Sequence, residues 1–379
     1  MKGRYDVVVI GAGPIGSYTA YQLADKGFKV CLVDAKEKIG ENVLCAGVIS
    51  KAAFKRYDLP SESIVARIDS ISFFSPFGQR LEYEPQDVFA YVVDRDLFDR
   101  KLFLQAKRFG VDIIMKQKVV DITGAAYFYS VKTDGKNIST KAVVIATGGD
   151  YQLQNKVGLG TAPHYLYGSQ VELPVPSARD KIEIHIGRDF APGSFGWVIP
   201  YHENTSKIGV ILAQKGKTWL KKFVDQRLGE TSKTDIKEIG IKPIVYGTIE
   251  KSTNGCILAV GEAAGQVKTT TGGGIFYGLL CSEIAVDKLT KTLRDGYSLS
   301  DYEITWRSSL TPELDIGMNL RSISAKLSDQ DIENLFSFVK QNKFWVELLV
   351  PRINFDYHSN FIFYCLKSFG QLLGIRNSK

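Results

Sequence analysis

The chain has 379 residues, of which 44% are hydrophobic and 23% charged, so it is long enough for roughly two to three globular domains. Its net charge of +7 fits either a solvated basic surface or attraction to an anionic membrane or ligand. No apolar run is long enough for a membrane-spanning helix, and no cluster of basic and aromatic residues indicates a nucleic-acid-binding module.

Cysteine usage and the start of the chain indicate a reducing compartment. The start, MKGRYDVVVIGAG, runs directly into a predicted strand and has no signal-peptide pattern. The cysteines show neither CxxC spacing nor neighbouring histidines; they are Cys31, Cys45, Cys256, Cys281 and Cys365. We therefore expect a cytoplasmic protein, with peripheral attachment to the inner face of the membrane as an alternative, and no bound metal.

The first forty residues predict a βαβ unit. Residues 5–10 form a β-branched run typical of a buried parallel strand, residues 14–26 predict a helix, and residues 29–35 predict the next strand. The turn between the first strand and the helix reads Gly-Ala-Gly-Pro-Ile-Gly at residues 11–16. This arrangement is typical of a dinucleotide site.

Each of the three glycines in that turn has a distinct physical role. Gly11 would make the tight turn, Gly13 would let a pyrophosphate approach the backbone, and Gly16 would let helix and strand pack closely. The phosphates would then lie at the positive end of the helix. Asp34 ends the second strand, where its carboxylate can accept hydrogen bonds from ribose hydroxyls.

The remaining elements alternate between sheet and helix. Residues 71–83 predict an antiparallel hairpin, and residues 94–110 predict a helix with Asp94 as its N-cap. Residues 165–250 show mostly alternating strand patterns. Further strands are expected at 111–115, around Val119 and at 127–131. Residues 141–149 predict a buried strand that runs into a turn, and residues 256–265 a buried strand followed by a loop. A long helix is expected at 274–293, and aromatic-rich helices over 299–379.

The fold class predicted by this order is α/β, or α+β overall: a Rossmann-like dinucleotide-binding domain with an inserted antiparallel-sheet substrate domain and a helical C-terminus. The cofactor domain is discontinuous and comprises residues 1–70, 88–160 and 251–298. The sheet-rich substrate domain comprises residues 71–87 and 161–250. Residues 299–379 form the C-terminal helical region.

Three further stretches favour FAD over NAD. Residues 145–149, Ile-Ala-Thr-Gly-Gly, match a strand-end turn of two-domain flavoproteins, and Arg95 begins the helix at 94–110. Gly272, Gly273 and Gly274 stand at the start of the long helix, where free N–H groups can hold a flavin oxygen and stabilise negative charge. A second strand–GxGxxG–helix unit, which a built-in NAD(P)H domain would need, is absent from the sequence.

With these motifs the chain resembles the geranylgeranyl reductase family of FAD proteins, within the para-hydroxybenzoate hydroxylase superfamily. The resemblance covers about residues 4–340. It rests on GAGPIGSYTAYQLADKG, IGENVLCAGVIS, VVDRDLFDRKL, APGSFGWVIP and VGEAAGQVKTTTGGGIFYGLL. The glycine motifs are shared by the flavoprotein superfamily, whereas the cysteine and tryptophan stretches narrow the resemblance to this family.

The resemblance implies a cofactor contact for particular residues. Arg95 would contact FAD from its helix, the Val119 backbone would meet the adenine, and Gly272–Gly274 would lie at the isoalloxazine. Glu262 stands where the family usually has Asp and would hold the ribityl chain. Neighbouring positions assigned to the cofactor are Ala12, Pro14, Ala46, Gly47, Gly148, Gly261 and Ile275.

The stretch FAPGSFGWVIP, residues 190–200, is similar to the reductase pattern P-x-x-Y-x-W-x-F-P. Pro192, Trp197 and Pro200 match, while Phe195 replaces Tyr and Ile199 replaces Phe. In a strand, residues 195, 197 and 199 share a face, which would form an apolar wall for an isoprenoid chain. The competing interpretation is a core strand with a buried tryptophan.

Cys45 is the candidate proton donor, since Phe195 lacks the hydroxyl of the family's tyrosine. The family often has a cysteine close to the flavin at this position, and alkene reduction needs a proton as well as a hydride. The competing interpretation of Cys45 is a small buried hydrophobe. The candidate catalytic residues are therefore Cys45, Trp197 and Phe195.

Three functions stay open at this point. The first is FAD-dependent reduction of isoprenoid double bonds, with a prenylated lipid or isoprenoid as substrate. Its external electron donor would be NAD(P)H, a ferredoxin or a deazaflavin. The second is a flavin halogenase or monooxygenase, because W-x-W-x-I-P of halogenases matches at Trp197, Ile199 and Pro200. The third is an electron-transfer flavoprotein that reduces a quinone. We further expect either a membrane-facing surface or ordinary helix packing over residues 336–375.

Overall fold

The computed structural model describes residues 4–175, 177–228, 236, 238–342 and 354–359. Its first sheet has eight strands gathered from three parts of the chain, with the order β17-β18-β11-β1-β2-β8 and with β10 and β9 continuing from β11. The strands are β1 (Tyr5–Ile10), β2 (Val30–Val33), β8 (Asp112–Ile114), β9 (Val119–Ala125), β10 (Phe128–Thr133), β11 (Asn137–Ile145), β17 (Thr253–Asn254) and β18 (Ile257–Ala259).

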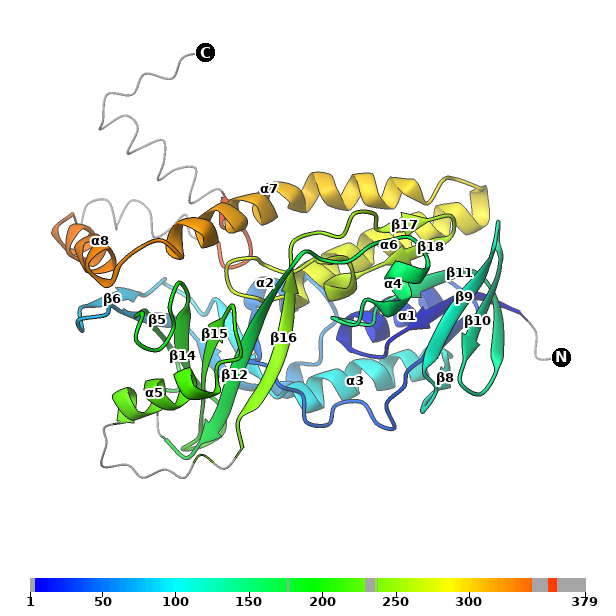
Figure 1. Ribbon diagram of the computed structural model, residues 1–379. Helices are drawn as coiled ribbons and strands as arrows, with labels where there is room; N and C mark the ends of the chain where they lie inside the picture. The colour runs from blue at the N-terminus through cyan, green and yellow to red at the C-terminus, as the bar shows by residue number, and fades with distance from the viewer. Residues whose placement is uncertain (1–3, 176, 229–235, 237, 343–353, 360–379) are drawn as a thin grey trace, which may run out of the picture.

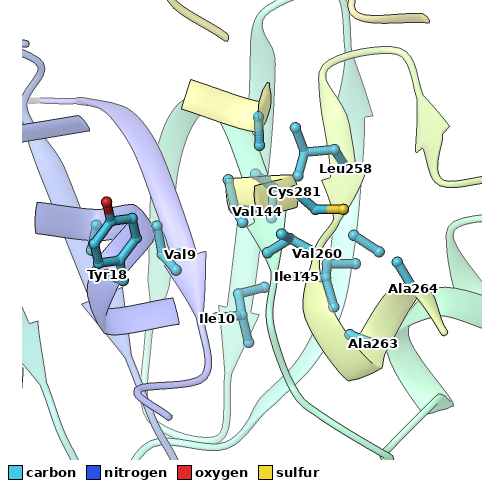
Figure 2. Packing of buried hydrophobic residues seen from close by; sticks show 14 of the residues in the cluster. Val9, Ile10, Tyr18, Val144, Ile145, Leu258, Val260, Ala263, Ala264 and Cys281 are labelled. Carbon is cyan, nitrogen blue, oxygen red and sulfur yellow. The ribbon is translucent and has the colours of Figure 1, made fainter. Parts of the chain in front are cut away.

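The central strands of this sheet are parallel and buried on both faces, as their continuous Val and Ile runs predict. β1 pairs in parallel with β2 and β11, and β11 pairs in parallel with β18. Figure 2 shows side chains of these strands gathered beside Cys281 of α6 (Ile275–Asp295). The predicted strand at residues 5–10 is confirmed to the residue.

A layer of helices packed against this sheet completes the nucleotide-binding fold that the order of elements predicts. α1 (Pro14–Asp25) packs against α3 (Arg95–Arg108) and α6. Asp94 caps α3 as expected, because its carboxylate accepts a hydrogen bond from the Leu97 amide at 3.1 Å. α4 (Gln152–Lys156) and the 3₁₀ turn η2 (Gly261–Ala264) complete this half of the molecule.

The second sheet has seven strands in the order β16-β12-β15-β14-β13-β5-β6 (Figure 1). All its pairs are antiparallel except β13 with β5, which is parallel because residues 70–83 join the sheet from far away in sequence. Its strands are β5 (Ser70–Phe74), β6 (Arg80–Tyr83), β12 (His164–Leu173), β13 (Lys181–His185), β14 (Phe195–Pro200), β15 (Ser206–Leu212) and β16 (Gly240–Tyr246).

Each face of the second sheet has its own core. α5 (Lys217–Leu228), a helix that the alternating pattern did not predict, covers one face around Phe223 and Val198. The opposite face carries Trp197, Ile199 and Ile211, which pack with Ala46 of the first half. The face beside Ala46 is the one that concerns function.

A third, smaller sheet was not predicted. Its order is β3-β7-β4, and it joins β3 (Val48–Ser50), β4 (Ile64–Ile68) and β7 (Ala90–Val93), each only a few residues long. α2 (Lys51–Arg56) and the 3₁₀ turn η1 (Ser61–Ser63) connect these strands. The domain boundaries expected at 70/71, 87/88, 160/161 and 250/251 stay a prediction.

Two more helices, α7 and α8, follow α6 along the chain. α7 (Ser300–Ser324) runs along the molecule from the region of β17 and β18 toward β6, and α8 (Asp329–Gln341) lies beside β6 (Figure 1). The helical prediction is thus confirmed for residues 300–341. Most of the aromatic stretch 336–375 lies outside the described residues. Over the described part of the chain, no helix is both long enough and apolar enough to cross a membrane.

Candidate functional site

The glycine turn after β1 leaves an open cradle at the start of α1. Gly11 has φ +102°, and a Cβ there would collide with the Ala146 carbonyl; a Cβ on Gly16 would overlap the Gly11 carbonyl oxygen. A Cβ on Gly13, by contrast, would meet nothing within 4 Å. No side chain caps α1, so its first-turn N–H groups face this space and can bind an anion.

Asp34 lies directly beside this cradle. Its Oδ2 accepts a hydrogen bond from the Ala12 amide at 2.6 Å, and its Oδ1 accepts one from the Lys36 amide at 2.8 Å. The Asp34 carbonyl accepts a hydrogen bond from the Gln117 amide, which brings the segment leading into Val119 to the same edge. A carboxylate has further lone pairs, so this one can still accept bonds from sugar hydroxyls.

Glu262 lies next to the turn that follows β11. A Cβ on Gly149 would stand 3.4 Å from Glu262 Oε1, and Gly148 approaches the same carboxylate. Oε1 is buried and has no hydrogen-bond partner among the described residues, while Oε2 is 3.8 Å from Lys242 Nζ. A buried acceptor without a donor is costly, and hydroxyl donors of a bound group would satisfy it.

The triple-glycine turn meets the second sheet. Gly272 has φ +75°, and a Cβ there would stand 3.1 Å from Ile211 of β15 and 3.3 Å from Ile244 of β16. The Gly272 amide donates to the Lys268 carbonyl at 2.8 Å, which closes the turn, and Gly274 begins α6 without a side-chain cap. The turn therefore presents a second helix N-terminus, with Ile275 as its first residue, toward the inner face of the second sheet.

The Lys268 side chain ties this turn to the segment 354–359. Lys268 Nζ donates to Asp356 Oδ1 at 2.7 Å and to the Phe355 carbonyl at 2.8 Å. Both charged side chains are buried, at 7% and 2% exposure. On the other side of the turn, Arg321 donates to the carbonyls of Thr269 and Thr270 at 2.8 and 3.0 Å.

Because an uncompensated buried charge is strongly unfavourable, Asp356→Ala is expected to lower the free energy of unfolding by about 3 kcal/mol. The double variant Lys268→Met/Asp356→Ala is expected to recover most of that loss, as both variants would show in denaturant titrations. Asp287→Ala is the matched control, since Asp287 pairs with Lys291 on the surface and is half exposed. An Asp356→Ala protein as stable as the Asp287→Ala control would contradict this prediction.

Cys45 lies between the two halves, in the loop before β3. Gly47, with φ +80°, approaches the Val93 backbone closely, which fixes this loop against β7. Arg95 is 8% exposed and forms a bidentate pair with Asp99. Burial opposes the thiolate, but Arg95, Lys242, the Gly47 amide and Lys207 together lower the pKa of Cys45 below its ordinary value.

The inner face of the second sheet is apolar at one end and polar at the other. Phe195 pairs with Ile211 across β14 and β15, Trp197 with Gly209, and Ile199 with Lys207. Trp197 is 8% exposed, its ring occupies the space that a Cβ on Gly209 would take, and its Nε1 has no partner among the described residues. Ala46 packs against this same apolar cluster, so the expected wall and the cysteine loop are neighbours.

Sequence reasoning missed three polar residues of this region. Gln170 and Lys207 both contact the Cys45 carbonyl, and Lys268 holds the glycine turn. The sequence carried a signal for one of them: Lys207 interrupts SKIGVIL, a strand whose every residue is buried. The contacts of the other two depend on which strands and segments meet in space.

The residues present fit FAD. The open cradle at Gly13 suits a pyrophosphate, and the orphaned Glu262 oxygen suits a polyol hydroxyl. The uncapped helix start at Gly274 suits a flavin oxygen. Over the described residues, no cluster of three or more potential metal ligands occurs.

Comparisons with known proteins show the family and the fold of this chain. Residues 5–170 match the pyridine nucleotide-disulphide oxidoreductase family. The chain is 30% identical to digeranylgeranylglycerophospholipid reductase of Methanocaldococcus jannaschii, over 87% of this chain and 89% of that protein.

Solved structures share the fold. A geranylgeranyl bacteriochlorophyll reductase-like protein from Thermoplasma acidophilum superposes with a TM-score of 0.82 at 21% identity, covering 89% of this chain and 91% of that one. A flavin-dependent brominase superposes with a TM-score of 0.72 at 16% identity, covering 98% and 100%. At these identities the structures establish the fold alone. The relative from Methanocaldococcus jannaschii, at 30% identity over most of both chains, identifies the family.

Proposed function

Because the chain belongs to the geranylgeranyl reductase family of FAD-dependent oxidoreductases, we propose that it reduces double bonds in the isoprenoid chains of a prenylated lipid. The observation that carries this proposal is the apolar inner face of β14 and β15 beside the Cys45 loop and the Gly272 turn. An uncharged wall of this kind suits a chain of methyl-branched alkene units. The relative from Methanocaldococcus jannaschii is named for such a lipid, which supports the choice of substrate.

The cofactor contacts follow the geometry of the three glycine turns. Gly11, Ala12, Gly13, Pro14 and Gly16 would hold the pyrophosphate, and Asp34 would hold the ribose. Glu262 would hold the polyol chain, with Gly148 and Gly261 beside it. The flavin ring would be held by Gly272–Gly274 with Ile275 and by Ala46 with Gly47, while Arg95 and the Val119 backbone would supply the remaining contacts. When bound, reduced FAD supplies a hydride to one alkene carbon.

This chain's own residues supply the proton and the environment. Cys45 donates a proton to the second alkene carbon, while Trp197 and Phe195 hold the chain and exclude water. The electron donor acts from outside the chain and is NAD(P)H, a ferredoxin or a deazaflavin. Contact with a membrane surface, which would present the lipid, belongs to this proposal as well.

Trp197→Ala is expected to slow prenyl reduction by about 10- to 100-fold and to leave FAD occupancy nearly unchanged, because the indole belongs to the apolar cluster of the second sheet that forms the proposed wall. Removing a buried indole also costs about 3–5 kcal/mol of stability. Turnover and FAD content should therefore be measured on protein that thermal melting shows to be folded.

Trp219→Ala provides the control, because Trp219 packs against the opposite face of the same sheet through α5. It should lower stability and leave the turnover of folded protein intact. Equal loss of FAD and of turnover in Trp197→Ala would assign Trp197 a structural role only.

A further inference from the structure

The main chain of Cys45 is held from the opposite sheet. Gln170 Nε2 of β12 and Lys207 Nζ of β15 each donate to the Cys45 carbonyl oxygen at 3.3 Å. Both side chains are buried, at 5% and 2% exposure. Cys45 itself belongs to the loop that links β2 to β3, so these two bonds connect the cofactor-binding half to the substrate sheet.

Lys207 is placed where a purely structural side chain would be apolar. Every residue of its strand, β15, is buried, and Ile199 of β14 lies directly across from Lys207. The carboxylate that pairs with it, Glu172, is 3.8 Å away and half exposed. Its ammonium lies 3.7 Å from the centre of the Tyr201 ring. A buried lysine with so distant a carboxylate is costly, which argues for a role in the site.

The charged groups near Cys45 are three cations, each paired with a carboxylate, and one further carboxylate; the three cations are the charges that lower the pKa of Cys45. From the first half come Arg95, which is bound to Asp99, and Asp94, the cap of α3. From the second sheet come Lys207 with Glu172, and Lys242 with Glu262. Burial lowers the pKa of Lys207, while Glu172 and the Cys45 thiolate act to raise it.

We propose that Lys207 is a positioning residue for Cys45, fixing the carbonyl of the cysteine loop and stabilising the thiolate of the same residue. The inference rests on the proposed function. In that reaction the S–H bond of Cys45 breaks as a C–H bond forms at one alkene carbon, and a hydride from reduced FAD forms the other C–H bond. The hydride carries both electrons, and the thiolate regains its proton from water. A cation bound to the carbonyl oxygen of the same residue favours the thiolate that this step leaves.

The test is the pH dependence of Cys45 alkylation by iodoacetamide in the FAD-loaded protein, followed at Cys45 by peptide mass spectrometry. Lys207→Met and Lys207→Gln are each expected to raise the pH midpoint by about one unit, so that alkylation at neutral pH slows about tenfold. Lys207→Gln keeps a donor for the carbonyl and carries the test if Lys207→Met does not fold. Lys207→Arg should keep the midpoint of the unmodified protein.

Lys181→Met is the matched control, because Lys181 lies on β13 of the same sheet and pairs with Glu82 and Glu84. Its midpoint should not move. A midpoint unchanged in Lys207→Gln, with FAD retained, would overturn the proposal. The proposed function is tested separately. If Cys45→Ala still reduced prenyl chains at the full rate, Cys45 would lose its role as proton donor. A shifted alkylation midpoint in the Lys207 variants would still support the coupling of Lys207 to Cys45.

Discussion

Gly13→Asp is expected to abolish FAD retention in a protein that still folds. A Cβ at this position meets nothing within 4 Å, so the new side chain has room. Asp is a favoured N-cap residue, and Gly13 is the N-cap of α1. The added carboxylate would, however, occupy the anion cradle and repel the pyrophosphate. We expect at least a 100-fold loss of FAD affinity, which corresponds to about 2.7 kcal/mol.

The measurement compares flavin absorbance per protein and the thermal midpoint of the apoprotein. Gly13→Asn has nearly the same size without the charge and should lose less affinity. Gly16→Ala should behave differently, because its methyl would overlap the Gly11 carbonyl and destabilise the fold itself. Full FAD occupancy of the Gly13→Asp protein would disprove the assignment of the pyrophosphate to the turn at Gly13.

Cys45→Ala is expected to slow prenyl reduction by about 10²- to 10⁴-fold, the usual contribution of a positioned general acid. Arg95, Lys242 and Lys207 lower the pKa of the Cys45 thiol, which makes it a stronger acid than a free cysteine. The acid form is needed, so the rate should fall as pH rises through the lowered pKa of Cys45. FAD content and the reduction of bound flavin by dithionite should stay unchanged, as single-turnover kinetics under anaerobic conditions would show.

Cys256→Ala is the control for this prediction, because Cys256 is buried in the core of the first half and is distant from the cysteine loop in sequence. It should reduce prenyl chains at the original rate. If Cys45→Ala did so too, the proton would have to come from water or from another group.

The cofactor half could be predicted because its signals are local. The first strand, the glycine turn, the cap Asp94 and the long helix α6 each depend on a few neighbouring residues. The prediction that Phe195, Trp197 and Ile199 share one face needed only the period of a strand. The apolar cluster of the second sheet contains all three.

The rest depends on contacts between distant segments. Lys268 and Asp356 are 88 positions apart, and Lys207 and Cys45 are 162 apart, so only the assembled fold brings them together. The small sheet β3-β7-β4 uses strands too short to show a period. α5 escaped prediction because the surrounding strand pattern dominated its window, although its apolar residues cover one face of the sheet.

The most direct test of the account is an anaerobic incubation of dithionite-reduced, FAD-loaded protein with geranylgeranyl lipids, analysed by mass spectrometry. The account predicts that each reduced double bond adds the mass of one H₂ while the flavin is reoxidised. An unchanged lipid mass, together with rapid oxygen consumption once air and an aromatic substrate are admitted, would contradict it and favour a halogenase or monooxygenase.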